Sequence, residues 1–235
     1  ASDVYKRQFN NCSSLESIIV DENNTVYDSR DNCNAIIETD SNRLLFGCNT
    51  TVIPNGVTSI GESAFLGCSG LTNITIPASV TTIGWGAFRN CSNLESIHVD
   101  ENNTVYDSRD NCDAIIETSS NSLVSGCSNT IIPASVTTIG TSAFEGCIGL
   151  TNIVIPAGVT WIGYFVFSGC SGLKKIIVDK NNTVYDSRDN CNAVIETKSN
   201  TLVVGCKNTV IPSGITSIGA DAFYGCSGLT SITIP

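Results

Sequence analysis

Apolar and polar residues alternate in short segments of the chain that begin at leucine or threonine. In residues 71–77, Leu71, Ile74 and Ile76 are apolar, polar residues stand between them, and Pro77 follows. Alternation with a period of two is typical of a half-buried β-strand. Equivalent segments occupy residues 15–20, 51–54, 94–99, 130–133, 150–156, 173–178, 209–212 and 229–235. The pattern therefore predicts nine strands, one for each turn of a repetitive chain.

A second pattern follows the proline in the shorter turns and predicts a compact corner. Gly61 gives the backbone freedom to change direction, and Ala64–Phe65 begins a predicted helical or 3-10 turn that ends near Cys68. A phenylalanine precedes a cysteine by three residues in every such turn. We expect these rings to stack as an apolar core ladder on the convex side: Phe9, Phe65, Phe88, Phe144, Phe167 and Phe223.

The whole pattern recurs with a period of 79 residues. Cys12, Cys91 and Cys170 begin three copies, each divided into turns of 23, 33 and 23 residues, and the third stops at Pro235 before it is complete. A long period indicates stacked units that bury a shared core. We therefore predict one repeat solenoid over residues 9–235, with a parallel sheet of about nine strands. Residues 1–8 do not fit the repeat, and we interpret them as a junction or tag.

The longer turns contain an insertion that predicts a β-hairpin. Two apolar runs, residues 35–38 and 44–46, flank a four-residue turn over 39–42. This turn places Glu38 opposite Arg43. The period then predicts three inserted hairpins, one in each copy.

Twelve cysteines fall into two groups. Six follow the phenylalanine ladder, and we expect them to be buried free thiols. The other six flank the hairpins, and counting outward from the turn places them in facing pairs. The candidate disulfides are Cys33 with Cys48, Cys112 with Cys127, and Cys191 with Cys206. They require an oxidising compartment, and because Cys48 aligns with the inward Leu71, ordinary core thiols remain the alternative.

Charge and residue types exclude several classes of function. The 12 Lys and Arg residues against 22 Asp and Glu residues give a net charge of −10 without a basic cluster, which excludes nucleic acid and anionic membranes as partners. No apolar run approaches the roughly 18 residues of a membrane-spanning helix. The single histidine, His98, is isoleucine in the other two copies, so we expect no catalytic triad, metal or cofactor. Residues 21–31 offer oxygen ligands for calcium, although Asx turns explain them better.

The combined motif Leu-x-x-Ile-x-Ile-Pro-x-x-Val-x-x-Ile-Gly-x-x-Ala-Phe-x-x-Cys resembles the BspA-like leucine-rich repeat family. The resemblance covers residues 9–235, with Val166 in place of the usual alanine and a bulkier corner at Tyr164–Phe165. It implies a curved, right-handed leucine-rich repeat array, mostly β with short helical or 3-10 turns. It also implies a secreted or cell-surface microbial protein, often an adhesin that binds host or neighbouring-cell proteins, and it supplies no catalytic residues.

The outward positions of the predicted strands are the strongest functional signal, and we place them on the concave side. The fifth-position row is Ile19, Val52, Thr75, His98, Ile131, Val154, Ile177, Val210 and Thr233. The third-position candidates beside it are Asn73, Asn129, Asn152, Lys175 and Asn208. An apolar stripe rimmed by small polar residues is typical of a protein-binding surface. Two alternatives remain open: β-branched residues favour strands in any case, or the hairpins cover the row.

The sequence thus predicts a non-catalytic protein-binding repeat module, an extracellular or cell-surface adhesin fragment that binds a protein or another extended ligand. The alternative is a structural spacer that holds another domain away from the surface. Neither end resembles a polar cap, so we also expect end-to-end self-association.

Overall fold

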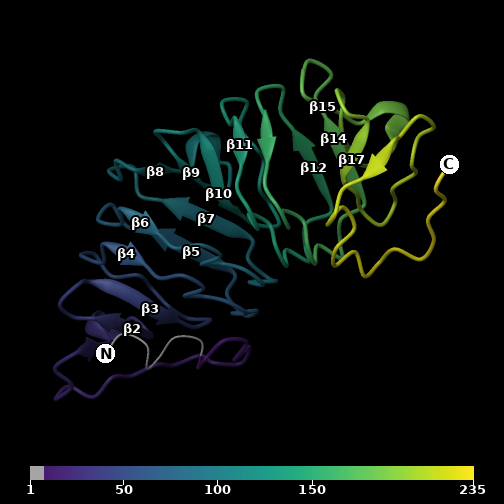
Figure 1. The fold of residues 1–235 in the computed structure, drawn as a ribbon. Coiled ribbons are helices and arrows are strands. Elements are labelled where there is room, and N and C mark those ends of the chain that lie inside the picture. Colours follow the sequence, from purple (N-terminus) through teal and green to yellow (C-terminus); the bar gives the residue numbers. More distant parts are fainter. Residues whose placement is uncertain (1–7) are drawn as a thin grey trace.

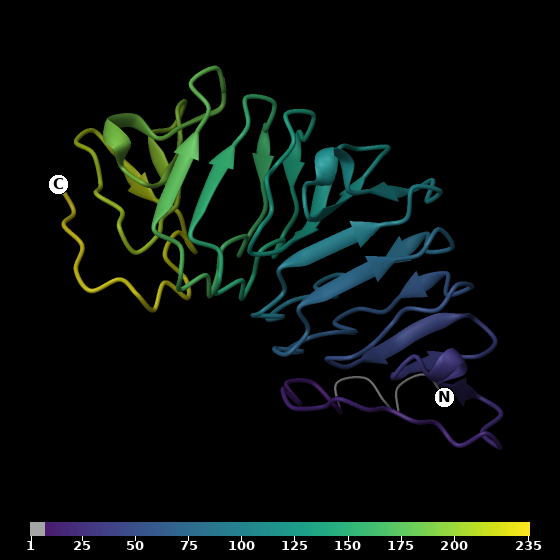
Figure 2. The same cartoon turned by 180° about the vertical axis from the view of Figure 1, so that it is seen from behind.

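The computed structural model describes residues 8–235, whose turns stack side by side into an arc with the two ends far apart (Figure 1). The predicted junction segment therefore lies outside the described residues except for Gln8. Most regular elements are short strands, and Figure 2 shows the same arc from behind. Helices within residues 8–235 are limited to three 3-10 turns, η1 (Arg30–Asn32), η2 (Arg109–Asn111) and η3 (Arg188–Asn190), which are far too short to cross a membrane. They lie in the polar loops, and the corner at Ala64–Phe65, where the sequence predicted a helical or 3-10 turn, is a hydrogen-bonded turn without a helix.

Each copy builds a mixed sheet around its inserted hairpin. In the first copy β1 (Tyr27–Asp28), β2 (Ala35–Glu38) and β3 (Arg43–Gly47) are antiparallel, and β4 (Ser59–Ile60) and β6 (Thr82–Ile83) continue parallel to β3. The second copy repeats this with β8 (Tyr106–Asp107), β9 (Ala114–Glu117), β10 (Ser122–Gly126), β11 (Thr138–Ile139) and β13 (Trp161–Ile162). The third has β15 (Tyr185–Asp186), β16 (Val194–Glu196), β17 (Thr201–Val204) and β18 (Ser217–Ile218). The three predicted hairpins are confirmed, with Glu38 opposite Arg43.

The predicted nine-stranded parallel sheet is wrong. Four of the nine predicted segments, all within the described residues, form strands, and they make two separate parallel pairs. The pairs are β5 (Asn73–Ile76) with β7 (Ser96–Val99), and β12 (Asn152–Ile155) with β14 (Lys175–Val178).

The long turns interrupt the pairing of strands because their backbone groups form hydrogen bonds within the same turn. Val52 donates its N–H to the carbonyl oxygen of Cys33 at 3.1 Å, within the same turn. The Thr51 hydroxyl accepts from the Cys48 N–H at 2.7 Å and donates to the Asn34 carbonyl oxygen at 2.6 Å. Pro54 has no N–H to offer. Few backbone groups remain there to pair with a neighbouring turn, so the sheet breaks at each long turn.

The phenylalanine corners lie along the inner edge of the arc, whereas the sequence predicted them on the convex side. In Figure 1 the strands run from this inner edge outwards. The rings stack in two pairs, Phe65 on Phe88 at 5.1 Å and Phe144 on Phe167 at 5.3 Å between centroids, whereas Phe9 meets Phe46 in a tilted contact. The six predicted rings therefore do not form one continuous ladder. The long turns have no such corner: Gly47 passes beneath Phe65, where an added Cβ would lie 2.2 Å from the ring. Two corners for every three turns shorten this edge, which accounts for the curvature.

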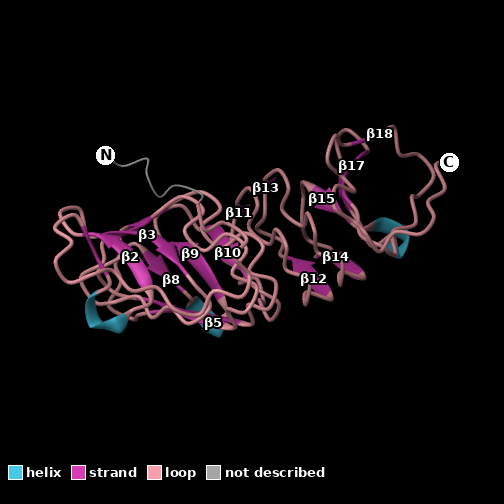
Figure 3. Cartoon of the chain, turned by 90° about the horizontal axis from the view of Figure 1, so that it is seen from below, coloured by secondary structure: helices cyan, strands magenta, loops and turns pink. Residues whose placement is uncertain are grey.

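The core lies inside the stacked turns, between two opposite sides of the arc, here called its flanks. Side chains from both flanks point into it. Figure 3 shows β5, β12 and β14 on one side of the molecule, with β11, β13 and β18 towards the other. Alternate residues of the paired strands point inward, so Ile74 and Ile76 are buried while Asn73 and Thr75 are exposed. Deep burial of β-branched and aromatic side chains supplies the main stabilisation of such stacked turns.

Candidate functional site

The outward side chains of β5, β7, β12 and β14, with the equivalent residues of the long and terminal turns, form one exposed surface, here called the strand face. Thr75 lies opposite His98, and Val154 lies opposite Ile177, on hydrogen-bonded neighbouring strands. All candidates from the two rows are exposed: Ile19, Val52, Thr75, His98, Ile131, Val154, Ile177, Val210, Thr233, Asn73, Asn129, Asn152, Lys175 and Asn208. The structure therefore places the paired candidates of neighbouring strands side by side and leaves the other candidates exposed to solvent.

The strand face continues across the long turns although no strand is formed there. The backbone N–H groups of Ile131 and Val210 bond to Cys112 and Cys191, as Val52 does to Cys33. These hydrogen bonds fix the backbone of each long turn, so its exposed aliphatic side chain is held beside the neighbouring turn. A shallow depression of about 450 Å³ in this face is lined in part by Val52, Asn73 and Thr75.

The hairpins do not cover the strand face. Ile19 is 85% exposed, Ile131 is 76% exposed and Val210 is 69% exposed, so the aliphatic row is open to solvent. In Figure 3, β10 and β17 of the hairpins lie away from β5, β12 and β14. Because the strands run from the inner to the outer edge of the arc, the face lies on a flank and not on the concave side that the sequence predicted (Figure 1).

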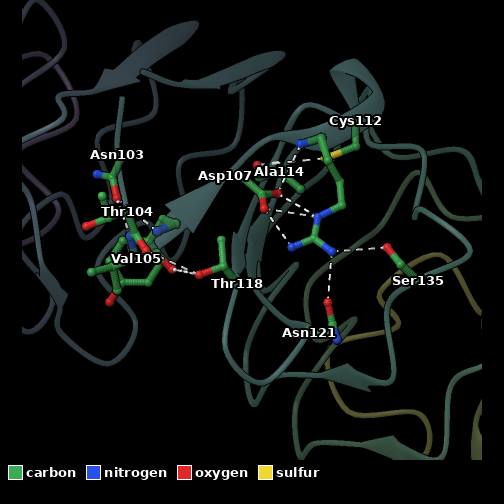
Figure 4. A network of polar contacts seen from close by, with 11 residues as sticks. Asn103, Thr104, Val105, Asp107, Cys112, Ala114, Thr118, Asn121 and Ser135 are labelled. Carbon is green, nitrogen blue, oxygen red and sulfur yellow. Dashed lines mark hydrogen bonds and ion pairs between the residues drawn. The ribbon is translucent and has the colours of Figure 1, made fainter. Parts of the chain in front are cut away.

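The polar loop before each hairpin forms a network of hydrogen bonds within the chain. Asn103 accepts hydrogen bonds from the N–H groups of Val105 and Tyr106, each at 2.9 Å, and its amide donates to two carbonyls of the preceding turn. Arg109 binds both carboxylate oxygens of Asp107 and also donates to Asn121 in the hairpin turn (Figure 4). These oxygens are committed to hydrogen bonds within the chain. Within residues 8–235, no group of three His, Cys, Asp or Glu side chains is placed to hold a metal ion.

The cysteines beside the hairpins do not face each other. Ala35 pairs with Gly47, which leaves Cys48 next to Asn34, and a bulge between the Ile36 and Ile37 pairings shifts the register by one residue. The Cys48 thiol instead donates to the Asn34 carbonyl oxygen at 3.3 Å. All twelve cysteines, which lie within the described residues, are free thiols. The candidate pairs Cys33–Cys48, Cys112–Cys127 and Cys191–Cys206 are therefore not bonded, and the counting that paired them is wrong.

The thiols along the corner ladder have a role that the sequence did not suggest. Cys91 donates to the carbonyl oxygen of Phe65 at 3.1 Å, and Cys170 donates to that of Phe144 at 3.0 Å. Burial raises the pKa of both thiols well above the ordinary range. Each thiol thus acts as a small buried hydrogen-bond donor between neighbouring turns. Counting apolar positions could not reveal a donor, because a buried alanine or valine would fit the same pattern.

The comparisons with known proteins agree with this architecture. The model of the BspA type leucine-rich repeat region matches the chain in six copies, over residues 43–125, 115–202 and 194–235. A leucine-rich cell surface protein from Faecalibacterium prausnitzii A2-165 is 31% identical, with a TM-score of 0.59 over 97% of this chain and 55% of that chain. No curated protein matches the chain.

A second solved structure supports the fold alone. The pneumococcal vaccine antigen PcpA is 21% identical, with a TM-score of 0.52 over 80% of this chain and 47% of that chain. The chain therefore spans about half the length of the two proteins, 55% of the first and 47% of the second.

Proposed function

The chain belongs to the BspA-type leucine-rich repeat family, and on that premise we propose that it is a non-catalytic binding module of a microbial cell-surface protein. The module adheres to a protein or another extended ligand on a host cell or a neighbouring cell. The name of the Faecalibacterium prausnitzii relative, a cell surface protein, supports the location.

The observation that carries the proposal is the exposure of aliphatic side chains along the strand face. Six of the nine residues in the fifth-position row are valine or isoleucine, and all six stand among the exposed large hydrophobic residues: Ile19, Val52, Ile131, Val154, Ile177 and Val210. A row of exposed apolar side chains beside small polar residues is what a protein partner covers on binding.

The chemistry of the strand face suggests how the ligand is held. The face is almost uncharged, so attraction comes from burial of valine and isoleucine and from hydrogen bonds by asparagine side chains such as Asn73 and Asn152. Each turn presents a similar surface, so an extended ligand that touches several turns gains avidity. Binding through such a face depends weakly on salt, despite the net charge of −10.

A structural spacer is the second candidate, and one observation favours it. The polar loops direct their hydrogen bonds inward: Asn103 ties its loop to Pro77 and Val80 of the preceding turn, and Asn182 ties the next copy to Pro156 and Val159. Such cross-turn bonds stiffen a stack of turns, which suits a stalk.

Titration of the purified chain onto intact host and bacterial cells distinguishes the two candidates. A binding module saturates a finite number of sites, and unlabelled chain displaces the bound protein. A spacer shows only linear, non-displaceable adsorption on every cell type, and that result would contradict the proposal.

A further inference from the structure

A niche opens on the inner edge of the arc at two of the long turns, where a corner is missing. In the third copy the niche lies between residues 162–168 and 219–226, with Val203 and Val204 of β17 at its base, and has a volume of about 130 Å³. The second copy has the same niche between residues 83–89 and 140–142, with a volume of about 190 Å³. In the first copy the equivalent residue at the base is Phe46, which is buried against Phe9 with 5.1 Å between ring centroids.

The niche of the second copy holds a cation of the chain itself. The guanidinium carbon of Arg89 lies 4.6 Å from the centre of the Trp85 ring, and its Nη2 lies 2.6 Å from the Glu145 carboxylate. An aromatic face and a carboxylate together form the environment that a guanidinium group prefers.

The third niche has aromatic and acidic groups comparable to those of the second niche, and it lacks the cation. By the 79-residue period, Tyr164 replaces Trp85 and Ser168 replaces Arg89. The period also places Tyr224 at the Glu145 position, while Asp221 supplies a carboxylate at the Ser142 position. Among the ion pairs between described residues, none involves Asp221. The third niche thus has the aromatic and acidic groups for a cation, without a cation of its own.

The aromatic groups of the third niche are exposed to solvent and lie close to one another. Tyr164 is 69% exposed and Tyr224 is 63% exposed, and the Phe165 ring meets the Tyr224 ring edge-on at 5.4 Å between centroids. Phe165 has a φ of 56°, where the second niche has Gly86 with a φ of 62°. Ser63 and Ser142 occupy the same corner position with φ values of 56° and 60°, so the positive φ is a feature of these corners, and Phe165 differs from the others only in its bulk.

We propose that the third niche binds the guanidinium group of an arginine side chain on a partner protein. Tyr164, Phe165 and Tyr224 supply the aromatic faces, and Asp221 supplies the counter-charge. The inference rests on the proposed function in taking a protein as the partner, and it adds the chemistry of one anchor residue. The net charge of −10 favours the approach of a basic partner.

The test titrates the chain with Nα-acetyl-arginine methylamide and follows the backbone amide signals of Phe165 and Tyr224 by NMR. We expect saturable shifts confined to the third niche. The citrulline analogue has nearly the same shape without the charge, and we expect it to bind at least about tenfold more weakly. The Asp221→Asn and Tyr224→Ala variants should each weaken arginine binding by about tenfold with little change in melting temperature, because Tyr224 is largely exposed and Asp221 is half-buried without an ion pair to lose.

Two further variants use the second copy as an internal control. Ser168→Arg places an arginine in the third niche at the position equivalent to Arg89, and it should block binding there. Arg89→Ala removes the cation from the second niche, and the arginine analogue should then also shift the amide signals near Trp85. Phe165→Gly should keep or raise the melting temperature, because it relieves the positive φ, while weakening arginine binding.

Equal binding of the arginine and citrulline analogues would overturn the inference, as would undiminished binding by Ser168→Arg. A lysine analogue that binds as tightly as arginine would also contradict the arginine assignment. These results do not test the strand face. If the chain still binds cells saturably while its third niche does not bind the arginine analogue, only this inference is refuted and the proposed function stands.

Discussion

The backbone N–H of Asn90 donates to the carbonyl oxygen of Glu145 at 2.9 Å, although a complete long turn separates the two residues in the chain. The corners that contain them touch directly, because the long turn between them has no corner of its own. The same contact joins Asn11 to Leu66 one copy earlier. This relationship accounts both for the curvature of the arc and for the niches along its inner edge.

Gly146 makes the contact between these corners possible, and we predict that Gly146→Ala is strongly destabilising. Its φ is 78°, and an added Cβ would lie 2.3 Å from the Asn90 side-chain oxygen. Gly56 has a φ of 95° with nothing within 4 Å of an added Cβ, so Gly56→Ala measures the cost of the backbone conformation alone. We expect Gly56→Ala to cost about 1–2 kcal/mol of unfolding free energy and Gly146→Ala clearly more in chemical denaturation. Equal losses would show that the close approach is unimportant.

Asn103 makes four hydrogen bonds, two within its own loop and two to the preceding turn, and its loss should loosen the second copy. Asn103→Ala leaves two backbone N–H groups and two carbonyl oxygens without this partner, and we expect a loss of about 2–4 kcal/mol in unfolding free energy. The neighbouring Asn102 bonds only to Asp100 at the surface, so Asn102→Ala should cost less than about 0.5 kcal/mol. If the two variants unfold at the same denaturant concentration, the cross-turn role of Asn103 is refuted.

Acid should weaken the fold through the aspartates of the polar loops. The side-chain hydrogen bond from Arg30 lowers the pKa of Asp28 below its ordinary value of 3.8. A carboxylate whose pKa is lower in the folded state stabilises the protein when the pH is above the pKa of the unfolded state. This contribution is lost as the pH falls through the pKa of the folded state. Melting temperatures should be measured from pH 6 to pH 2, a range that extends about two units on either side of the ordinary aspartate pKa. The melting temperature of Asp28→Asn should fall less steeply over this range than that of the parent. Parallel curves would contradict the prediction.

The buried thiols should resist alkylation until the chain unfolds. Burial raises the pKa of Cys147 to about 12, so almost no reactive thiolate forms near neutral pH. Cys12 is exposed and should react first with iodoacetamide. Mass spectrometry of the unfolded, non-reduced protein should then find all twelve cysteines alkylated. If Cys33 and Cys48 carried no adducts, they would be joined by a disulfide in solution, which would contradict the free thiols of the structure.

Local patterns in the sequence predicted the hairpins but not their detailed register. The four-residue turn fixes Glu38 opposite Arg43 because both residues are adjacent to it. Counting further outward fails at the bulge in β3, which adds one residue to that strand and separates Cys33 from Cys48. A bulge depends on contacts between turns, so it has no signal in the spacing of apolar residues.

The strand face was predictable and the continuous sheet was not, for related physical reasons. Alternation alone sets which residues point outward, and Thr75 and Val154 are exposed as their positions indicate. Pairing between turns depends on where the backbone hydrogen bonds go, and Thr51 takes those of the long turn for itself. The inner-edge position of the corners could have been found by noting that the corners are fewer than the turns. The niche was signalled only by the bulky Tyr164–Phe165 pair, whose ligand chemistry required the comparison with Arg89.

Substitution of the strand face tests the central claim most directly. The combined variant Ile131→Lys, Val154→Lys and Ile177→Lys adds three charges to exposed positions, so the melting temperature should stay close to that of the parent. A control with Thr81→Lys, Thr160→Lys and Thr216→Lys adds the same charge at exposed positions outside the strand face. Saturable cell binding should be lost in the first variant and kept in the control. Equal binding by both variants and the parent would contradict the assignment of the strand face as the adhesive surface.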